Sequence, residues 1–221
     1  MGIKYKIDYN FFKKWTPKMA YVIGFIFADG SLEDASYLRG KYIRITNTNL
    51  FIVQKIKKVI KSDHTIVRRQ YDHPNRKDLF LLRIGSYEIY NDLLKFGLSP
   101  NKSLIIKFPK IPKKYFSYFL RGYFDGDGSI MLRNKYEVRI VFTSGSLDFL
   151  KSLAIMLSDD LGVKLQKVYN SHRSYQLCYR TYESLDVLKF IYKDKLNGLY
   201  IKKKYKIYTN ILARRRNLKI R

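Results

Sequence analysis

Two aspartates occupy matching places in two similar stretches of this chain. Asp29 ends one apolar run and precedes Gly30, and Asp127 ends a second apolar run and precedes Gly128. Carboxylates that meet in pairs hold divalent cations well, because they supply negatively charged oxygen ligands. If the fold brings the two aspartates together, they form the core of a small metal site.

The elements that must position these acids are predicted as helices with one smooth face. The two stretches align at a spacing of 98 residues, and small residues recur in each at four-residue intervals, which places them on one helical face. A face without bulk lets a second backbone approach closely, so we expect the two helices to pack side by side with both acids at one end. The small positions are Ala20, Gly24 and Ala28 in the first stretch and Gly122 and Gly126 in the second.

An alternative interpretation is that each aspartate only ends its helix in an Asp-Gly turn, which is a common arrangement. One such stretch alone would favour that interpretation. Two stretches with matched stripes, half a chain length apart, favour the paired site instead.

The charge of the chain predicts a polyanionic partner. Its 221 residues include 44 Lys and Arg against 18 Asp and Glu, and the resulting net charge of +26 repels itself in a compact protein. Nucleic acid is the first candidate. An anionic membrane surface is the alternative, but there is no long uncharged apolar run, and we expect no signal peptide at residues 1–9.

The single cysteine, Cys178, excludes intramolecular disulfides and zinc sites built from several thiolates. It fits a reducing compartment, so we expect an intracellular location, either the cytoplasm of a prokaryote or an organelle matrix. We also expect no protein self-splicing, because the ends of the chain lack the residues that an intein needs.

The stretches YVIGFIFADGSL and FLRGYFDGDGSI resemble the LAGLIDADG motif of homing endonucleases, in the single-chain form that carries two motifs. Asp29 and Asp127 match the last acidic residue of the motif, which is the metal-binding catalytic carboxylate in the family. The first acidic position is kept as Asp125 in the second stretch, whereas Phe27 replaces it in the first. That position varies in the family, and the resemblance in element order covers nearly the whole chain.

The hydrophobic pattern predicts an α+β fold of two halves, residues 1–110 and 111–221, each with the order αββαββα. The first half is predicted as a motif helix at 16–29, strands at 31–37, 42–48, 65–70 and 79–85, and helices after Asn49 and at 86–96. The second half is predicted as a motif helix at 113–127, a hairpin that turns near residues 134–135, a helix at 146–161, strands at 164–169 and 175–181, a helix at 183–192 and a basic helical tail from Leu199. The resemblance implies a pseudo-twofold axis, with two antiparallel four-stranded sheets forming a DNA-binding saddle around the paired helices.

The resemblance also implies a function. We expect a monomeric homing endonuclease that makes a metal-dependent double-strand break in a long, specific duplex DNA target, leaves short 3′ overhangs and serves intron homing. Mg²⁺ suits a sparse site made of Asp29, Asp127 and the backbone carbonyls of Ala28 and Gly126, and Mn²⁺ or Ca²⁺ can occupy the same site.

The family places a basic residue near each acid, and two lysines are candidates. Lys102 is the candidate in the first half. Lys204 is the candidate in the second half, with Lys203 as the substitute. The alternative for any of these lysines is a solvated charge or one that contacts phosphate, because the chain has 44 basic residues.

Outward-facing strand residues are predicted to read the DNA. Arginine suits guanine, and asparagine or glutamine suits adenine, so polar residues that alternate with apolar ones are the candidates. The stronger candidates are Arg44, Thr46, Gln70, Arg83, Arg133, Arg139, Gln176 and Arg180, and the outward-facing Thr143 is a further candidate. The weaker candidates are Ser31, Glu33, Tyr42, Arg68 and Lys135.

Two other functions fit the same scaffold. One is an RNA-splicing maturase that binds structured intron RNA, and the other is a non-catalytic DNA-binding regulator. Retention of both Asp29 and Asp127 favours an endonuclease over a regulator. Nothing in the sequence separates the endonuclease from the maturase.

Overall fold

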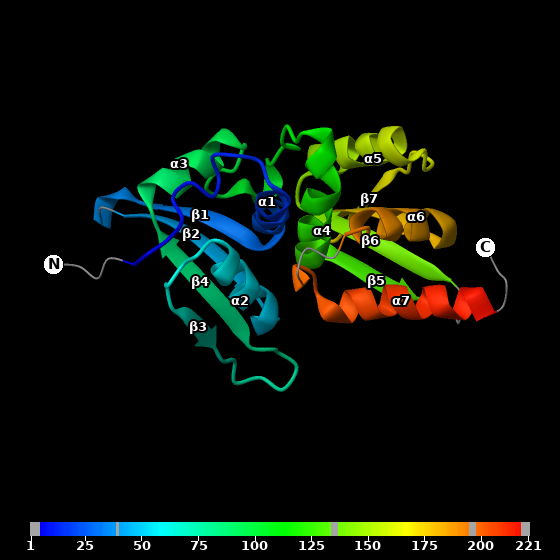
Figure 1. The fold of residues 1–221 in the computed structure, drawn as a ribbon, viewed down its shortest axis with the longest axis horizontal. Helices are drawn as coiled ribbons and strands as arrows, with labels where there is room; N and C mark the ends of the chain where they lie inside the picture. The colour runs from blue at the N-terminus through cyan, green and yellow to red at the C-terminus, as the bar shows by residue number, and fades with distance from the viewer. Residues whose placement is uncertain (1–4, 39, 134–136, 195–197, 218–221) are drawn as a thin grey trace.

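The computed structural model of the chain describes residues 5–38, 40–133, 137–194 and 198–217. Within these residues the chain forms seven α-helices and two four-stranded antiparallel sheets, so the predicted α+β class is confirmed. One sheet lies on each side of a central pair of helices, α1 and α4 (Figure 1). No helix in this part of the chain is long and apolar enough to cross a membrane.

The first half contains three α-helices and the first sheet. Its elements are α1 (Pro17–Asp29), β1 (Gly30–Ala35), β2 (Gly40–Asn47), α2 (Leu50–Val59), β3 (Ile66–Arg69), β4 (Leu79–Gly85) and α3 (Tyr87–Lys95). Short 3-10 turns lie at Ser36–Leu38 and, in the connector between the halves, at Lys102–Leu104 and Lys113–Tyr115.

The second half repeats this order and adds one helix. Its elements are α4 (Phe116–Asp127), β5 (Gly128–Leu132), β6 (Val138–Ser144), α5 (Leu147–Leu161), β7 (Val168–Ser171), β8 (Ser174–Arg180), α6 (Thr181–Ile191) and α7 (Lys202–Asn217). The strand orders are β1-β2-β4-β3 and β5-β6-β8-β7, so the two sheets share one topology and the internal repeat is real.

Local sequence signals explain most of the helix boundaries. Three hydroxyl oxygens cap α1, α3 and α5. Each accepts a hydrogen bond from the backbone N–H of the residue three positions later, and they belong to Thr16, Ser86 and Ser146. Gly162 follows α5 with φ of +65°, a conformation that suits glycine at the end of a helix. Asparagine is a common helix N-cap, and the residue type of Asn49 predicts that its side chain caps α2. Asn49 does precede α2, but its side chain makes no capping hydrogen bond.

Two predictions about the second sheet need correction. The seventh strand starts at Val168 rather than near residue 164, because the β7–β8 hairpin turns at Arg173, which has φ of +60°. Alternation with the inward-facing Val138, Ile140 and Phe142 predicts that Val141 faces outward, and Val141 does lie on the face opposite the helices, but it is only 3% exposed. It occupies a central strand between Ser129 and Cys178, so neighbours on both sides cover it.

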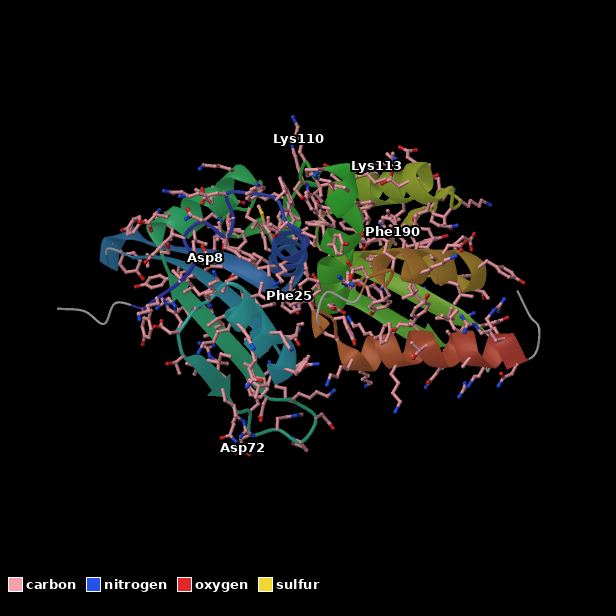
Figure 2. All side chains as sticks on the ribbon, in the orientation of Figure 1. Asp8, Phe25, Asp72, Lys110, Lys113 and Phe190 are labelled. Carbon is pink, nitrogen blue, oxygen red and sulfur yellow. The ribbon has the colours of Figure 1, made fainter. Side chains whose placement is uncertain are left out.

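A single hydrophobic core runs through both halves. Phe25 of α1 is fully buried at its centre, and Figure 2 shows it between the two sheets. The core continues from α1 into α4 without a break, so the two halves support the same central helix pair. The boundary at residues 110 and 111 remains a prediction about domain organisation.

Candidate functional site

The two motif helices cross at two glycines. A Cβ atom on Gly24 would overlap the carbonyl oxygen of Phe119, and one on Gly122 would overlap the carbonyl oxygen of Tyr21. Each glycine therefore contacts the backbone of the other helix in the same way. The predicted smooth faces of α1 and α4 therefore do pack against each other, and the reciprocal contact relates the two helices by an approximate twofold.

The close backbone contact between α1 and α4 continues to the C-terminal ends of the two helices. A Cβ atom on Gly126 would overlap the Cβ atom of Ala28 and would lie 3.4 Å from Cγ of Asp29. Asp127 is the next residue after Gly126, and it ends α4 as Asp29 ends α1. The helix crossing therefore brings both acids to one place.

The two carboxyl groups affect each other electrostatically. Burial, together with the neighbouring Asp29 carboxylate, raises the pKa of Asp127 to about 7. Burial also raises the pKa of Asp29, against the lowering effects of a hydrogen bond from Asn47 and of the charges on Lys204 and Lys102. Two neighbouring, partly buried carboxyl groups favour a bound cation, because a cation allows both of them to be ionised.

Both predicted lysines lie at this site. Nζ of Lys102 donates to the carbonyl oxygen of Phe27 at 2.6 Å and lies 3.4 Å from that of Ala28, at the end of α1. Burial lowers the pKa of Lys102, whereas the charges on Asp127 and Asp29 raise it. The contact with Ala28 means that one carbonyl predicted to bind metal already faces a positive charge.

Lys204 occupies the equivalent place at the end of α4. Its Nζ donates to the carbonyl oxygens of Phe124 at 2.6 Å, Asp125 at 2.9 Å and Gly128 at 2.6 Å. Burial lowers the pKa of Lys204, and nearby acids, Asp125 foremost, raise it. Lys203, the predicted substitute, is exposed to solvent.

The sequence interpretation missed Asn47, which is the last residue of β2. Its Nδ2 donates to Oδ2 of Asp29 at 2.5 Å, and its Oδ1 accepts the N–H of Asn49 at 2.8 Å, which fixes the amide orientation. The available signal was the hairpin register, since β1 begins directly after Asp29 and pairs with the end of β2. Ser144 ends the corresponding strand β6, where its Oγ accepts the N–H of Ser146 at 3.1 Å.

Asp125, the other acidic residue of the second motif, points away from this pair. It is 1% exposed, and its Oδ2 accepts from the hydroxyl of Tyr21 at 2.7 Å and from the N–H of Ile201 at 3.0 Å. Burial raises the pKa of Asp125 to about 6. Ile201 directly precedes α7, so its hydrogen bond with Asp125 holds the start of the helix that carries Lys204 against α4.

The chemistry of the donor set fits a hard divalent cation. Asp29, Asp127 and the adjacent backbone carbonyls all offer oxygen, which Mg²⁺ and Ca²⁺ prefer. No group of three or more His, Cys, Asp or Glu residues that could hold a metal occurs in the described part of the chain. A metal here therefore needs other ligands besides the protein, such as water or phosphate oxygens.

The first sheet places most of the predicted DNA-reading residues on one face. Ser31 pairs with Arg44, and Arg44 pairs with Arg83, so all three share the face away from the helices. Glu33 and Tyr42 are paired on the same face. Thr46 also lies on this face by alternation along β2, and its hydroxyl is 3.3 Å from the carbonyl oxygen of Asp29.

Arg68 and Gln70 are placed differently from the prediction. Arg68 pairs with Phe80, whose side chain is on the helix-covered face, and it forms a salt bridge with Asp78. Gln70 lies beyond the end of β3. The alternation that guided the prediction was displaced by one residue, so Arg69 is the β3 arginine on the outer face.

The second sheet also gathers its predicted residues on one face. Arg139 pairs with Arg180, and Thr143 pairs with Gln176. Arg133 follows the end of β5 and is exposed. Tyr169 lies opposite Gln176 on β7 and was not among the predicted residues. Lys135 lies outside the described residues.

Comparison with known proteins places this geometry among relatives. Residues 116–215 match the family model of the LAGLIDADG-like domain. The chain is similar to the homing endonuclease I-WcaI bound to its DNA recognition sequence, with 13% identity, a TM-score of 0.61 and 90% of each chain covered. It is also similar to I-SmaMI bound to uncleaved DNA in the presence of calcium ions, with 15% identity, a TM-score of 0.56, and 92% of this chain and 93% of that one covered.

A third similar structure is full-length DUF199/WhiA from Thermatoga maritima, whose name does not describe an endonuclease. It shows 14% identity and a TM-score of 0.58, with 94% of this chain and 65% of that chain covered. At such low identities these three likenesses establish a shared fold. The fold alone therefore does not establish DNA cleavage.

Curated relatives share only a segment with this chain. A probable translation initiation factor IF-2 from Thermococcus kodakarensis is 29% identical over 161 residues, which are 68% of this chain and 12% of that protein. The RNA polymerase subunit Rpo1C from Methanocaldococcus jannaschii is 30% identical over 155 residues, 69% of this chain and 16% of that protein. The segment similar to this chain is only a small part of each of these two proteins, and the two proteins have different names. Neither name therefore describes the function of that segment.

Proposed function

We propose that this chain is a site-specific endonuclease of the LAGLIDADG family, in its single-chain form with two motifs, and that it cuts both strands of duplex DNA. The observation that carries the proposal is the meeting of Asp29 and Asp127 at the ends of two helices that cross through reciprocal glycine contacts. Duplex DNA has two strands related by a local twofold axis, and a protein with an internal twofold offers one acid to each.

The residues around this pair have separate roles in the proposed reaction. Asp29 and Asp127, with the carbonyls of Ala28 and Gly126, would hold Mg²⁺, or Mn²⁺ or Ca²⁺ in its place, and the bound ion would activate water and neutralise developing charge on phosphate. Lys102 and Lys204 face the acids from either half and balance negative charge at the phosphate. Asn47 holds the Asp29 carboxylate in one orientation.

The outer faces of the two sheets are the proposed DNA-binding surface. They carry the arginines Arg44, Arg69, Arg83, Arg139 and Arg180 on a chain whose net charge is +26. A two-stranded ribbon fits the major groove, and side chains on its outer face can reach base edges. We propose a long recognition site that extends over both sheets, with cleavage between them that leaves short 3′ overhangs.

Two alternatives stay open to test. One is a DNA-binding regulator without cleavage, because WhiA, whose name does not describe an endonuclease, shares the fold over 94% of this chain. The other is an RNA-splicing maturase, which would bind intron RNA, whereas the two endonuclease structures compared above are bound to DNA.

Cleavage of a cognate target tests the proposal. A duplex pool with a randomised centre is first enriched for sequences that the protein binds in Ca²⁺, and the winning sequence is cloned into a supercoiled plasmid. With Mg²⁺ we expect one double-strand cut. Asp29→Asn and Asp127→Asn should each abolish that cut while DNA affinity and thermal stability are kept.

A matched control and two contrary outcomes complete the test. Asp72→Asn removes a carboxylate from the exposed loop between β3 and β4, far from the helix pair (Figure 2), and should leave cleavage unchanged. Specific binding without any cut by the unmodified protein would favour the regulator. Tight binding of structured RNA and no DNA consensus would favour the maturase.

A further inference from the structure

We propose that Arg83 reads a guanine in the half of the DNA target that lies on the first sheet, and that Glu33 and Tyr42 fix its guanidinium for this purpose. The inference deepens the proposed function and rests on it, because it assigns a base to one place on the proposed DNA-binding surface. Three contacts on the outer face of β1, β2 and β4 carry it.

Glu33 clamps one side of the guanidinium. Nε of Arg83 donates to Oε2 of Glu33 at 3.2 Å, and Nη2 donates to Oε1 at 2.8 Å. The two side chains come from strands that are separated by β2, so the pair spans the sheet. The hydrogen bonds with Arg83 also lower the pKa of Glu33, so the clamp is charged at neutral pH.

Tyr42 supports the guanidinium from below. Cζ of Arg83 lies 3.4 Å from the centre of the Tyr42 ring, which is a stacking distance. A Cβ atom on Gly40 would overlap the ring edge, and one on Gly85 would lie 3.2 Å from ring atom Cε1. The two glycines therefore leave the space that this ring fills, and the ring provides a flat base for Arg83.

The remaining hydrogen-bond donors of Arg83 match guanine. A guanidinium has five N–H groups in a fixed plane, and Glu33 uses one on Nε and one on Nη2. The end of the fork, which comprises Nη1 and the second hydrogen of Nη2, is not used by Glu33. In the major groove guanine presents two acceptors side by side, N7 and O6, and these suit that end of the fork. Glu33 can thus hold the arginine while the arginine contacts the base.

The second sheet carries different side chains at the positions equivalent to Arg83, Glu33 and Tyr42. The strand pairing places Cys178 where the first sheet has Arg83, and Met131 where the first sheet has Glu33. Arg139 takes the place of Tyr42. Nη2 of Arg139 lies 3.0 Å from the sulfur of Cys178 instead of a carboxylate. The clamped arginine therefore occurs on one sheet, and the preferred target should be asymmetric, with this guanine in one half only.

Selection from a randomised duplex pool in Ca²⁺ tests the inference without requiring cleavage. The unmodified protein should enrich a consensus that contains an invariant guanine in one half. In Arg83→Lys, which keeps the charge but not the fork, and in Arg83→Ala, preference for that guanine should fall by about 5- to 150-fold, the range of one bidentate arginine–guanine contact. All other consensus positions should stay unchanged.

Two further variants separate reading from charge and from clamping. Arg76→Ala removes an exposed arginine that stacks on Tyr71 in the β3–β4 loop, and it should lower affinity without altering the consensus. Glu33→Ala should weaken the guanine preference less than Arg83→Ala does, because the fork is kept but is no longer held.

The contrary results are distinct. If the folded Arg83→Lys and Arg83→Ala proteins enrich the same consensus with the same guanine preference as the unmodified protein, Arg83 does not read that base. If the unmodified protein binds duplex DNA but enriches no consensus at all, site specificity itself is absent and the proposed function fails with the inference.

Discussion

The centre of the molecule and the outer faces of its sheets differ in how far the two halves have diverged. At the centre, Gly24 and Gly122 make reciprocal contacts, and Lys102 and Lys204 each bind carbonyl oxygens at the end of a motif helix. On the outer sheet faces, most equivalent positions carry different side chains, such as Arg83 against Cys178 and Glu33 against Met131. Close backbone contact tolerates little change, whereas a surface that binds an asymmetric ligand is free to vary and gains specificity when it does.

The largest expected effect comes from breaking the symmetric centre. Gly24→Leu places a side chain where the backbone of Phe119 already lies, so the helices must separate and the core must open. We expect the free energy of unfolding to fall by at least about 3 kcal/mol, the upper end for overpacked sites. Thermal and urea unfolding measure this.

Gly122→Leu should destabilise the protein to a similar degree, because its contact with Tyr21 is the counterpart. Ala213→Leu, at an exposed position of α7, adds the same kind of side chain and should change stability by less than about 0.5 kcal/mol. A wild-type unfolding curve for Gly24→Leu would show that the two helices do not cross there.

A second prediction concerns a departure from symmetry that directly contacts one of the two acids. Asn47 holds Asp29, whereas Ser144 is shorter and bonds locally to Ser146. Asn47→Ser should slow cleavage of the strand that Asp29 serves by at least about 10-fold, since a hydrogen bond to a charged group contributes about 1.5–3 kcal/mol. The other strand should be cut at the original rate, which end-labelling of each strand in turn measures.

Asn49→Ser is the matched control, because the Asn49 side chain makes no capping hydrogen bond. It should leave the ratio of the two strand rates as in the unmodified protein. Equal slowing of both strands in Asn47→Ser would mean that Asn47 supports the fold rather than Asp29.

The smallest expected effect lies on the sheet face. Glu33 and Arg83 have side chains that are 34% and 41% exposed, and an exposed ion pair contributes about 0–1 kcal/mol to stability. Glu33→Ala should therefore shift the unfolding free energy by less than about 1 kcal/mol. A loss of several kcal/mol would show that this pair maintains the fold, and would weaken its assignment to DNA reading.

The sequence predicted the fold well because the signals are local and repeated. The capping residues Thr16, Ser86 and Ser146, together with the two glycine stripes, fixed the helices and their pairing. Asn47 was missed because its role depends on strand register rather than on a motif. Arg68 was placed on the wrong face because β3 is short, and a displacement of one residue reverses every side chain in a strand.

The role of Asp125 also could not be read from the motif. Its carboxyl group accepts from Tyr21, 104 residues away, and from the backbone of Ile201, 76 residues away. Such contacts are set by the packing of α4 against α1 and by the path of the chain into α7. A motif alone shows that an acid is present, but not which way it points.

The central claim, that the helix crossing brings Asp29 and Asp127 together, has a direct consequence for proton binding. The pKa of Asp127 is raised from 3.8 to about 7 by burial and by Asp29. The folded protein therefore keeps a proton that the unfolded chain releases, and this contribution to stability is present below about pH 4 and is lost as the pH rises through about 7.

A carboxyl ¹³C NMR titration of Asp127 in the metal-free protein tests the claim most directly. We expect a midpoint near 7 in the unmodified protein and a clearly lower one in Asp29→Asn, which keeps the shape of the site but removes the neighbouring charge. An Asp127 midpoint near 4 in the unmodified protein, or one that Asp29→Asn leaves unchanged, would contradict the claim.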